Sequence, residues 1–212
     1  VFTISVSASG VVTLDQARAV QHSDGSNAND TVALAANSIS LTATATDKDG
    51  DKATQTVNLG AGFVFTDDAP TVTATASNVT TLTVDETTLA TNASASFANV
   101  FTVNYGADGA GSTAYALAVV NAASGLVDTA TGQAVSMSVD ASGNVVGKNT
   151  NGDTVFTISV SSAGVVTLDQ ARAVMHADGS NANDTVALAA NSISLTATAT
   201  DKDGDSASQT VN

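Results

Sequence analysis

The sequence predicts an all-β protein built from antiparallel β-sandwich domains, and three observations lead to this fold class. Many short segments alternate in polarity or run in β-branched residues, with Gly, Asn, Asp and Ser between them. Of the 20 acidic residues, 19 are Asp and only Glu86 is Glu. Asp favours turns whereas Glu favours helices, so the acids are expected in loops. The third observation is a long internal repeat of these same strand patterns.

The strand patterns follow one another through most of the chain. In order they are VFTISVS (1–7), GVVTL (10–14), SISLTATAT (38–46), ATQTVNL (53–59), FVF (63–65), TVTATAS (71–77), TLTVDE (81–86), TAYALAVV (113–120), AVSMSVD (134–140) and NVVGK (144–148), and the first three then recur at 155–161, 164–168 and 192–200. The segments ASG, NGD and SAG between strands are typical of tight turns. Helix is expected only as a turn or two within 87–99 and 168–174.

Residues 1–58 align with residues 155–212, and 52 of the 58 aligned positions are identical. Near-identity at so long a period indicates a tandem array of whole domains. Pro70, the sole proline, follows two acids and reads as a stiff junction. We therefore predict that residues 1–68 are the C-terminal part of one repeat plus a linker, and that residues 69–212 are a complete β-sandwich repeat. Whether residues 1–66 fold as a small sheet or stay partly exposed is left open.

The composition limits the partners of this chain. Its formal net charge is −14, with only six Lys and Arg residues, so nucleic acid and anionic membranes are not expected as partners. There is no cysteine for a disulfide or a Cys-based zinc site. No apolar run approaches 18 residues, so membrane insertion is not expected. Divalent cations are the natural counterions.

The strand pattern TATAT ends twice in DKDGD, which places Asp47, Asp49 and Asp51 on one loop and Asp201, Asp203 and Asp205 on its copy. Two like charges about 4 Å apart cost roughly 4 kcal/mol at an effective dielectric constant of 20, so either a cation offsets the repulsion or the loop stays open to water. Calcium prefers six to eight oxygen ligands, although the glycine spacing is not that of an EF-hand. A solvated acidic turn is the other interpretation.

Further acids favour calcium over a solvated turn. Asp67 and Asp68 follow the first DKDGD loop after one more strand, and Asp85 and Glu86 end the TLTV pattern. We expect Asp47, Asp49 and Asp51 to converge with these two acidic pairs between two domains.

Other polar residues receive structural interpretations. In HSDGSNANDT, an Asx-rich hairpin loop is the favoured interpretation of Asp24, Asn27 and Asp30, with calcium binding as the alternative, and Asp108 in GADGAG is expected in a turn. His22 and His176 are expected to cap or pack over their loops, because no nucleophile motif accompanies them. Asp15 and Asp169 are expected to cap a short helical turn. The chain is therefore not expected to be an enzyme.

The ordered run of DxDGD, FxDDAPT, VDETTL, FTVNYGADG, TGQAVSMSV, VFTISV and QARAVxH resembles the tandem repeats of giant repeats-in-toxin adhesins, which type I systems of Gram-negative bacteria secrete. The resemblance spans essentially the whole chain. It implies immunoglobulin-like β-sandwich domains in series, with Ca2+ at the linkers. The implied ligands are Asp47, Asp49, Asp51, Asp67, Asp68 and Glu86, with Asp201, Asp203 and Asp205 in the second copy. The glycine-rich nonapeptide repeats of the wider family are absent from this sequence.

The resemblance also implies a role. The chain would be a calcium-rigidified extender segment of a bacterial cell-surface adhesin, monomeric and extracellular, serving adhesion and biofilm formation, with neighbouring repeats of the same chain as its partners. A sugar- or ice-binding module on the same scaffold is the alternative. Thr42, Thr44 and Thr46 alternate on one strand face, as an ice-binding surface requires, but two Tyr and no Trp weigh against carbohydrate stacking.

Overall fold

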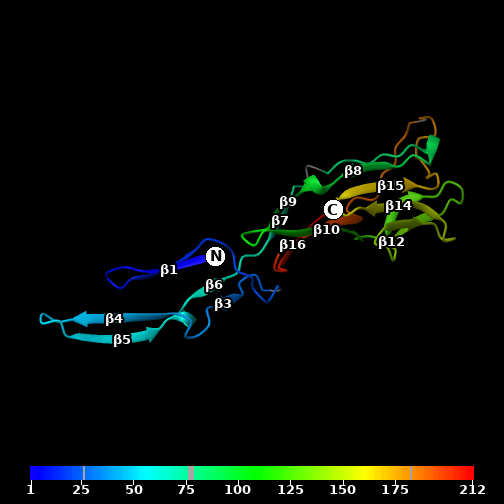
Figure 1. The fold of residues 1–212 in the computed structure, drawn as a ribbon. Helices are drawn as coiled ribbons and strands as arrows, with labels where there is room; N and C mark the ends of the chain where they lie inside the picture. The colour runs from blue at the N-terminus through cyan, green and yellow to red at the C-terminus, as the bar shows by residue number, and fades with distance from the viewer. Residues whose placement is uncertain (26, 76–78, 182) are drawn as a thin grey trace. The chain divides into compact units, whose positions relative to one another are not determined.

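The computed structural model describes residues 1–25, 27–75, 79–181 and 183–212 and divides the chain into two compact units (Figure 1). Unit 1 comprises 1–70 together with 105–111 and 200–206, and unit 2 comprises 71–104, 112–199 and 207–212. The main division thus falls after Pro70, and two later loops that the sequence placed in the second domain belong to unit 1. None of the helices in the described ranges has the length and apolar character of a membrane-spanning helix.

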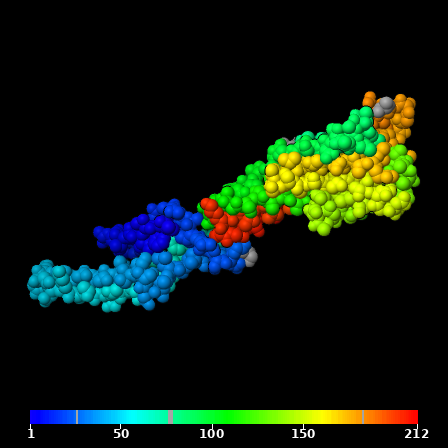
Figure 2. Space-filling view, turned by 45° about the vertical axis from the view of Figure 1, so that its right-hand side comes forward, coloured from blue at the N-terminus to red at the C-terminus, as the bar shows by residue number. Residues whose placement is uncertain are grey.

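Unit 1 consists of three two-stranded antiparallel sheets, β1–β2, β3–β6 and β4–β5. Its elements are β1 (Phe2–Val6), β2 (Val12–Gln16), β3 (Thr31–Ala33), β4 (Ser40–Thr46), β5 (Lys52–Asn58), the 3-10 helix η1 (Gly60–Gly62) and β6 (Val64–Thr66). Its large apolar side chains are mostly half-exposed, and Phe65 of β6 is the only member of the buried hydrophobic core that lies in unit 1 among the described residues. Figure 2 shows the cyan β4–β5 segment as a thin projection of unit 1.

Unit 2 has a six-stranded sheet in the order β11–β12–β13–β14–β15–β8, a three-stranded sheet β10–β16–β17 and the pair β7–β9. Its elements are β7 (Thr71–Ala74), the 3-10 helix η3 (Glu86–Thr88), β8 (Ala93–Ser96), the 3-10 helix η4 (Ala98–Val100), β9 (Phe101–Asn104), β10 (Ala110–Val119), β11 (Ala123–Val127), β12 (Ala134–Val139), β13 (Val145–Lys148), β14 (Thr154–Val160), β15 (Val165–Gln170), β16 (Ile193–Asp201) and β17 (Ser206–Val211).

The core of unit 2 draws on all of these sheets. Val155 of β14 is fully buried, as is Ala197 of β16, and Phe101 of β9 joins the same apolar cluster. Gly147 of β13 lies against the Phe156 ring so closely that a Cβ there would collide with it. The protein is therefore all-β, and the arrangement of several sheets around one core is consistent with a β-sandwich.

Two local predictions are wrong, and a third is confirmed in part. The segment 81–85 forms no strand in the described structure, although Leu82 packs against the core. The helical turns expected within 87–99 are present as the 3-10 turns η3 and η4, but between them β8 forms an edge strand paired with β15. Strand β15 continues through Gln170, where a helical turn was expected. Pairing with neighbouring strands outweighed the weak local helix signals in both segments.

The expected caps Asp15 and Asp169 are also corrected, since both lie in strands, opposite Thr3 and Thr157. Two positions of the predicted strand 71–77, residues 76 and 77, lie outside the described residues.

Candidate metal centre

Five aspartates from three separate segments come together in unit 1, and we call them the carboxylate cluster. Asp67 follows β6, Asp108 lies between β9 and β10, and the loop between β16 and β17 supplies the rest. The cluster consists of Asp67, Asp108, Asp201, Asp203 and Asp205. One carboxylate oxygen each from Asp108, Asp201 and Asp203 lie within 4.8 Å of one another.

The DKDGD loop presents its acids through a tight backbone turn. The Asp201 N–H donates to the Asp205 carbonyl at 3.0 Å, and the Gly204 N–H donates to Asp201 Oδ1 at 3.1 Å. Gly204 has φ +114°, a conformation that side chains with a Cβ rarely adopt. The glycine therefore allows the turn that brings Asp201 and Asp205 to the same side.

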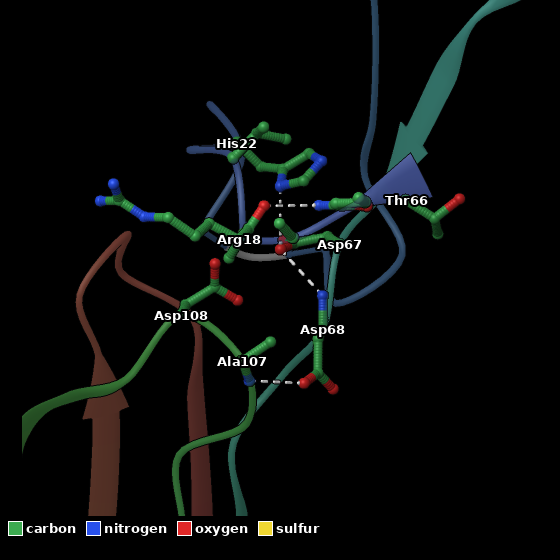
Figure 3. A pocket seen from close by; sticks show the side chains of 11 residues that line it. Arg18, His22, Thr66, Asp67, Asp68, Ala107 and Asp108 are labelled. Carbon is green, nitrogen blue, oxygen red and sulfur yellow. Dashed lines mark hydrogen bonds and ion pairs between the residues drawn. The ribbon is translucent and has the colours of Figure 1, made fainter. Parts of the chain in front are cut away.

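The linker after β6 is anchored by its own acids, as Figure 3 shows. The Asp68 N–H donates to Asp67 Oδ1 at 2.9 Å, and the Ala107 N–H donates to Asp68 Oδ2 at 2.8 Å. A Cβ on Gly106, whose φ is +69°, would collide with the Asp68 carboxylate. Glycine in the GADG motif thus permits the close approach between this loop and the linker.

The same residues border a pocket of about 330 Å³ in unit 1 (Figure 3). Its walls are formed by the segment after β2, by the linker and by the β9–β10 loop, that is by Gln16, Ala17, Arg18, Ala19, Val20, His22, Thr66, Asp67, Asp68, Ala107 and Asp108. Three segments distant in sequence therefore share one acidic concavity.

Asp67, Asp201 and Asp205 of the carboxylate cluster are buried, whereas Asp108 and Asp203 are half-buried. Asp205 is 2% exposed and Asp201 is 4% exposed. Within the described parts of the chain, both Asp205 oxygens lack a hydrogen-bond partner, as do Asp67 Oδ2, Asp201 Oδ2 and Asp203 Oδ1. A buried carboxylate without partners is strongly unfavourable unless it is protonated or bound to a cation.

The pKa values of these aspartates reflect the same unfavourable burial of charge. Burial, followed by the proximity of Asp67, Asp201 and Asp203, raises the pKa of Asp205 to about 6. Burial also raises the pKa of Asp201, with Asp203 adding to the effect. The pKa of Asp108 is raised by burial and then by the neighbouring carboxylates. A bound cation would reverse these shifts, because it favours the ionised form.

The protein offers this cluster little positive charge of its own. Among the ion pairs of the described residues, no Lys or Arg pairs with any of its five carboxylates. His22 Nδ1 lies 3.0 Å from Asp67 Oδ1, and the two form an ion pair only when the ring is protonated. His22 is only 6% exposed.

Asp47, Asp49 and Asp51, which we call the hairpin aspartates, form a separate group at the tip of the β4–β5 hairpin. All three are exposed, and the loop repeats the geometry of its copy, with the Gly50 N–H donating to Asp47 Oδ1 at 3.1 Å as the Gly204 N–H does to Asp201 Oδ1. Interaction with the Asp49 side chain, followed by a hydrogen bond from the Asp51 N–H, lowers the pKa of Asp47. The expected convergence of this group with Asp67 and Asp68 does not occur in the described structure.

Asp85 and Glu86 lie in unit 2 and serve local structure there. Asp85 caps η3 by accepting from the Thr87 N–H at 2.8 Å. Glu86 Oε1 accepts from the Val174 N–H at 2.7 Å and lies 3.5 Å from His176 Nε2. The second DKDGD loop, and not the first, therefore lies next to Asp67. Neither Asp85 nor Glu86 belongs to a metal-compatible group of the described residues.

Two residues of the site were assigned structural roles from the sequence. Asp108 was interpreted as a turn residue, and His22 as a residue that caps or packs over its loop. The available signals were the two flanking glycines of GADG and the position of His22 directly before an acidic loop. In the HSDGSNANDT loop, Asn27 and Asp30 accept hydrogen bonds from nearby backbone, as an Asx-rich loop would.

These features define an all-β chain of two near-identical segments with a buried acidic group suited to cations. A family model described as a domain of unknown function, DUF5801, matches residues 1–60 and 81–212, and the chain belongs to this family. Neither the curated proteins nor the solved structures contain a match.

Proposed function

We propose that this chain is a calcium-stabilised structural extender segment of a bacterial cell-surface adhesin, without catalytic activity. Its β-sandwiches would be immunoglobulin-like repeats in tandem, secreted by a type I system. The support is the long internal repeat, the resemblance of its ordered motifs to those of repeats-in-toxin adhesins, and a cluster of acids with buried oxygens that lack partners among the described residues.

The observation that carries the proposal is Asp205, which is buried near three other carboxylates and whose two oxygens have no hydrogen-bond partner among the described residues. An all-oxygen, flexible, strongly anionic donor set fits calcium, whereas magnesium demands near-ideal octahedral geometry. Asp108, Asp201, Asp203 and Asp205 would hold the ion, with Asp67 at its edge. Bound calcium supplies the positive charge that this part of unit 1 lacks.

Calcium here would tie together segments that are far apart in the chain. The linker after β6, the loop 105–111 and the loop 200–206 each contribute an acid to the cluster. Restricting the linker would stiffen a chain of such repeats in calcium-rich surroundings. In calcium-poor cytoplasm the same carboxylates would repel one another and leave the chain loose for export.

The alternative, a sugar- or ice-binding module, has weaker support. Tyr115 packs against Phe101, with ring centroids 6.0 Å apart, so it is not a free stacking platform. The threonine hydroxyls on the β4–β5 sheet bond to each other, with Thr42 Oγ1 and Thr56 Oγ1 at 2.8 Å. Such pairing is a common way to satisfy strand hydroxyls.

Thermal unfolding with calcium, with magnesium and with chelator tests the proposal. A ligand at 100 times its Kd stabilises a protein by about 2.7 kcal/mol, so calcium should raise the melting temperature by several degrees. Magnesium at the same concentration should do less. Asp205→Asn should reduce the calcium-dependent shift by more than half.

The repeat supplies a matched control, Asp51→Asn, in the same loop sequence at an exposed position. This variant should keep most of the calcium response. An unchanged melting curve in chelator, or an equal loss in both variants, would show that the cluster is not the calcium site.

A further inference from the structure

A second donor set in unit 1 differs in chemistry from the carboxylate cluster. One donor atom each from His22, Asp67 and Asp203 lie within 4.8 Å of one another. His22 comes from the segment after β2, Asp67 from the linker and Asp203 from the β16–β17 loop. In Figure 3 the His22 ring points at the Asp67 carboxylate.

The hydrogen bonds of His22 fix which ring nitrogen is free. Nε2 lies 3.3 Å from the Phe65 carbonyl oxygen, which can only accept, so Nε2 carries the hydrogen. In the neutral ring Nδ1 then presents a lone pair to Asp67 Oδ1 at 3.0 Å. Among the described residues, Nδ1 is buried without a hydrogen-bond partner. Two facing lone pairs repel, and either a proton on Nδ1 or a metal cation bound by both atoms removes the repulsion.

This arrangement is the one that metal-binding histidines usually have. A ligating imidazole typically donates its other N–H to a backbone carbonyl or a carboxylate, which orients the ring. The Phe65 carbonyl has this role here. Asp67 Oδ2 and Asp203 Oδ1 are also buried without partners, so two oxygen donors accompany the nitrogen.

We propose that His22, Asp67 and Asp203 form a mixed nitrogen–oxygen site for a divalent transition metal ion of the zinc class. Calcium takes oxygen ligands, whereas imidazole nitrogen with carboxylate oxygen suits zinc and its neighbours. The site shares Asp67 and Asp203 with the carboxylate cluster but is distinguished by His22. The inference does not depend on the proposed adhesin function.

The second copy of the sequence shows that the histidine loop alone does not make this site. His176 corresponds to His22, but its side chain is 30% exposed, and its Nε2 lies 3.5 Å from Glu86 Oε1. No metal-compatible group among the described residues includes His176. His176→Ala is therefore a matched control for His22→Ala.

The test uses the full 212-residue chain, freed of metal by a chelator that is then removed. Zinc is titrated calorimetrically in excess calcium, and Co2+ is used as a visible-absorbing probe. We expect one tight zinc equivalent that calcium does not displace, and Co2+ absorption bands that zinc abolishes. Loss of an outer-shell partner costs about 10–100-fold in affinity, so His22→Ala should weaken zinc binding by at least about 100-fold. His176→Ala should bind as the native chain does.

The proposal is overturned if the native chain binds no zinc, if calcium displaces it at equal concentration, or if the two histidine variants lose affinity equally. Should His22→Ala fail to fold, NMR of the histidine ring nitrogens in the native chain provides the test. Zinc should change the chemical shift of His22 Nδ1 and leave the His176 resonances unchanged. A shift at His176 and none at His22 would overturn the proposed site. Failure of the calcium proposal would appear separately, as a melting temperature insensitive to calcium while zinc still binds at His22.

Discussion

At the scale of single residues, the two DKDGD loops show that the surroundings determine the burial and the pKa of an aspartate. Asp47 and Asp201 have the same neighbours in sequence and the same turn geometry. Asp47 is exposed and its pKa is lowered by local hydrogen bonds, whereas Asp201 is 4% exposed and its pKa is raised by burial. The chemistry of these acids therefore depends on residues distant in sequence.

Asp128 of unit 2 is the contrasting case of a buried acid with every partner it needs. Arg172 donates to it twice, from Nε at 3.1 Å and Nη2 at 2.9 Å, and Thr131 and Asn149 also donate. The hydrogen bonds from Arg172 and Thr131 hold the pKa of Asp128 well below its usual range. This acid needs no metal, which separates it from the carboxylate cluster.

We predict that Asp128→Asn lowers the melting temperature of unit 2 at pH 7 by at least about 5 °C, because the buried pair with Arg172 is lost. A carboxyl with a lowered pKa in the folded state stabilises the fold above its unfolded pKa of about 3.9, and this contribution is lost as the pH falls below that value. The difference in melting temperature between the native chain and the variant should thus stay constant from pH 7 to pH 5 and narrow below about pH 4. Thermal unfolding monitored by circular dichroism measures this difference.

Asp169→Asn is the control, since Asp169 is an exposed position on β15 and surface changes usually alter stability by less than about 0.5 kcal/mol. A gap that persists unchanged at pH 3 would contradict the assigned role of the Asp128 carboxylate.

At the scale of elements, segments with strong alternation of polarity were mostly predicted correctly as strands. Whether a segment with a weaker pattern forms a strand depends on whether a neighbouring strand pairs with it. The strands at 1–7, 38–46, 134–140 and 144–148 all correspond to observed strands within a few residues. The TLTVDE segment has the alternation of a strand but finds no partner in the described sheets. Strand β8, with the weak pattern ASAS, is a strand because β15 pairs with it.

The residue types of the site could be predicted from the sequence, but their grouping could not. The spacing of DKDGD and DDAP along the chain favoured the first loop as the partner of the linker. In the structure, the loop between β16 and β17 lies next to Asp67 instead, through contacts between residues far apart in the sequence. Such contacts follow from strand pairing across the fold, which local patterns do not encode.

A pair of equivalent strands gives the element-scale prediction. Ala197 of β16 is fully buried, and its counterpart Ala43 of β4 is exposed. Ala197→Val should destabilise unit 2 by about 1–3 kcal/mol, because added methyl groups overfill a packed core. Ala43→Val should be neutral or slightly stabilising, because Val favours exposed strands. Urea unfolding of both variants measures the difference, and equal effects would show that the two strands have the same surroundings.

At the scale of the whole molecule, two near-identical segments end in different states because of what covers them. In unit 2, the strands of 155–212 pack with the strands of 71–154 into one apolar core. In unit 1 the strands of residues 1–58 form two-stranded sheets instead. Accordingly Leu195 is 6% exposed and Val155 fully buried, while Val1, the counterpart of Val155, is 56% exposed. Among the described residues, unit 1 therefore buries far fewer apolar side chains than unit 2 does.

Hydrogen exchange of the native chain should reveal this difference directly. Local opening is easiest where few apolar contacts are buried, so amides of β4 and β5 should exchange at least about 100-fold faster than those of β16 and β17. Lys52 and Ser206, which differ between the copies, let mass spectrometry separate the otherwise similar peptides. Calcium should slow exchange in the linker after β6 and in the loop 200–206, and leave the exposed β4–β5 hairpin nearly unchanged. Equal protection of the amides of 1–58 and 155–212 from exchange would mean that residues 1–58 have a core of their own. A calcium effect spread evenly over both segments would mean that the ion acts as a general counterion.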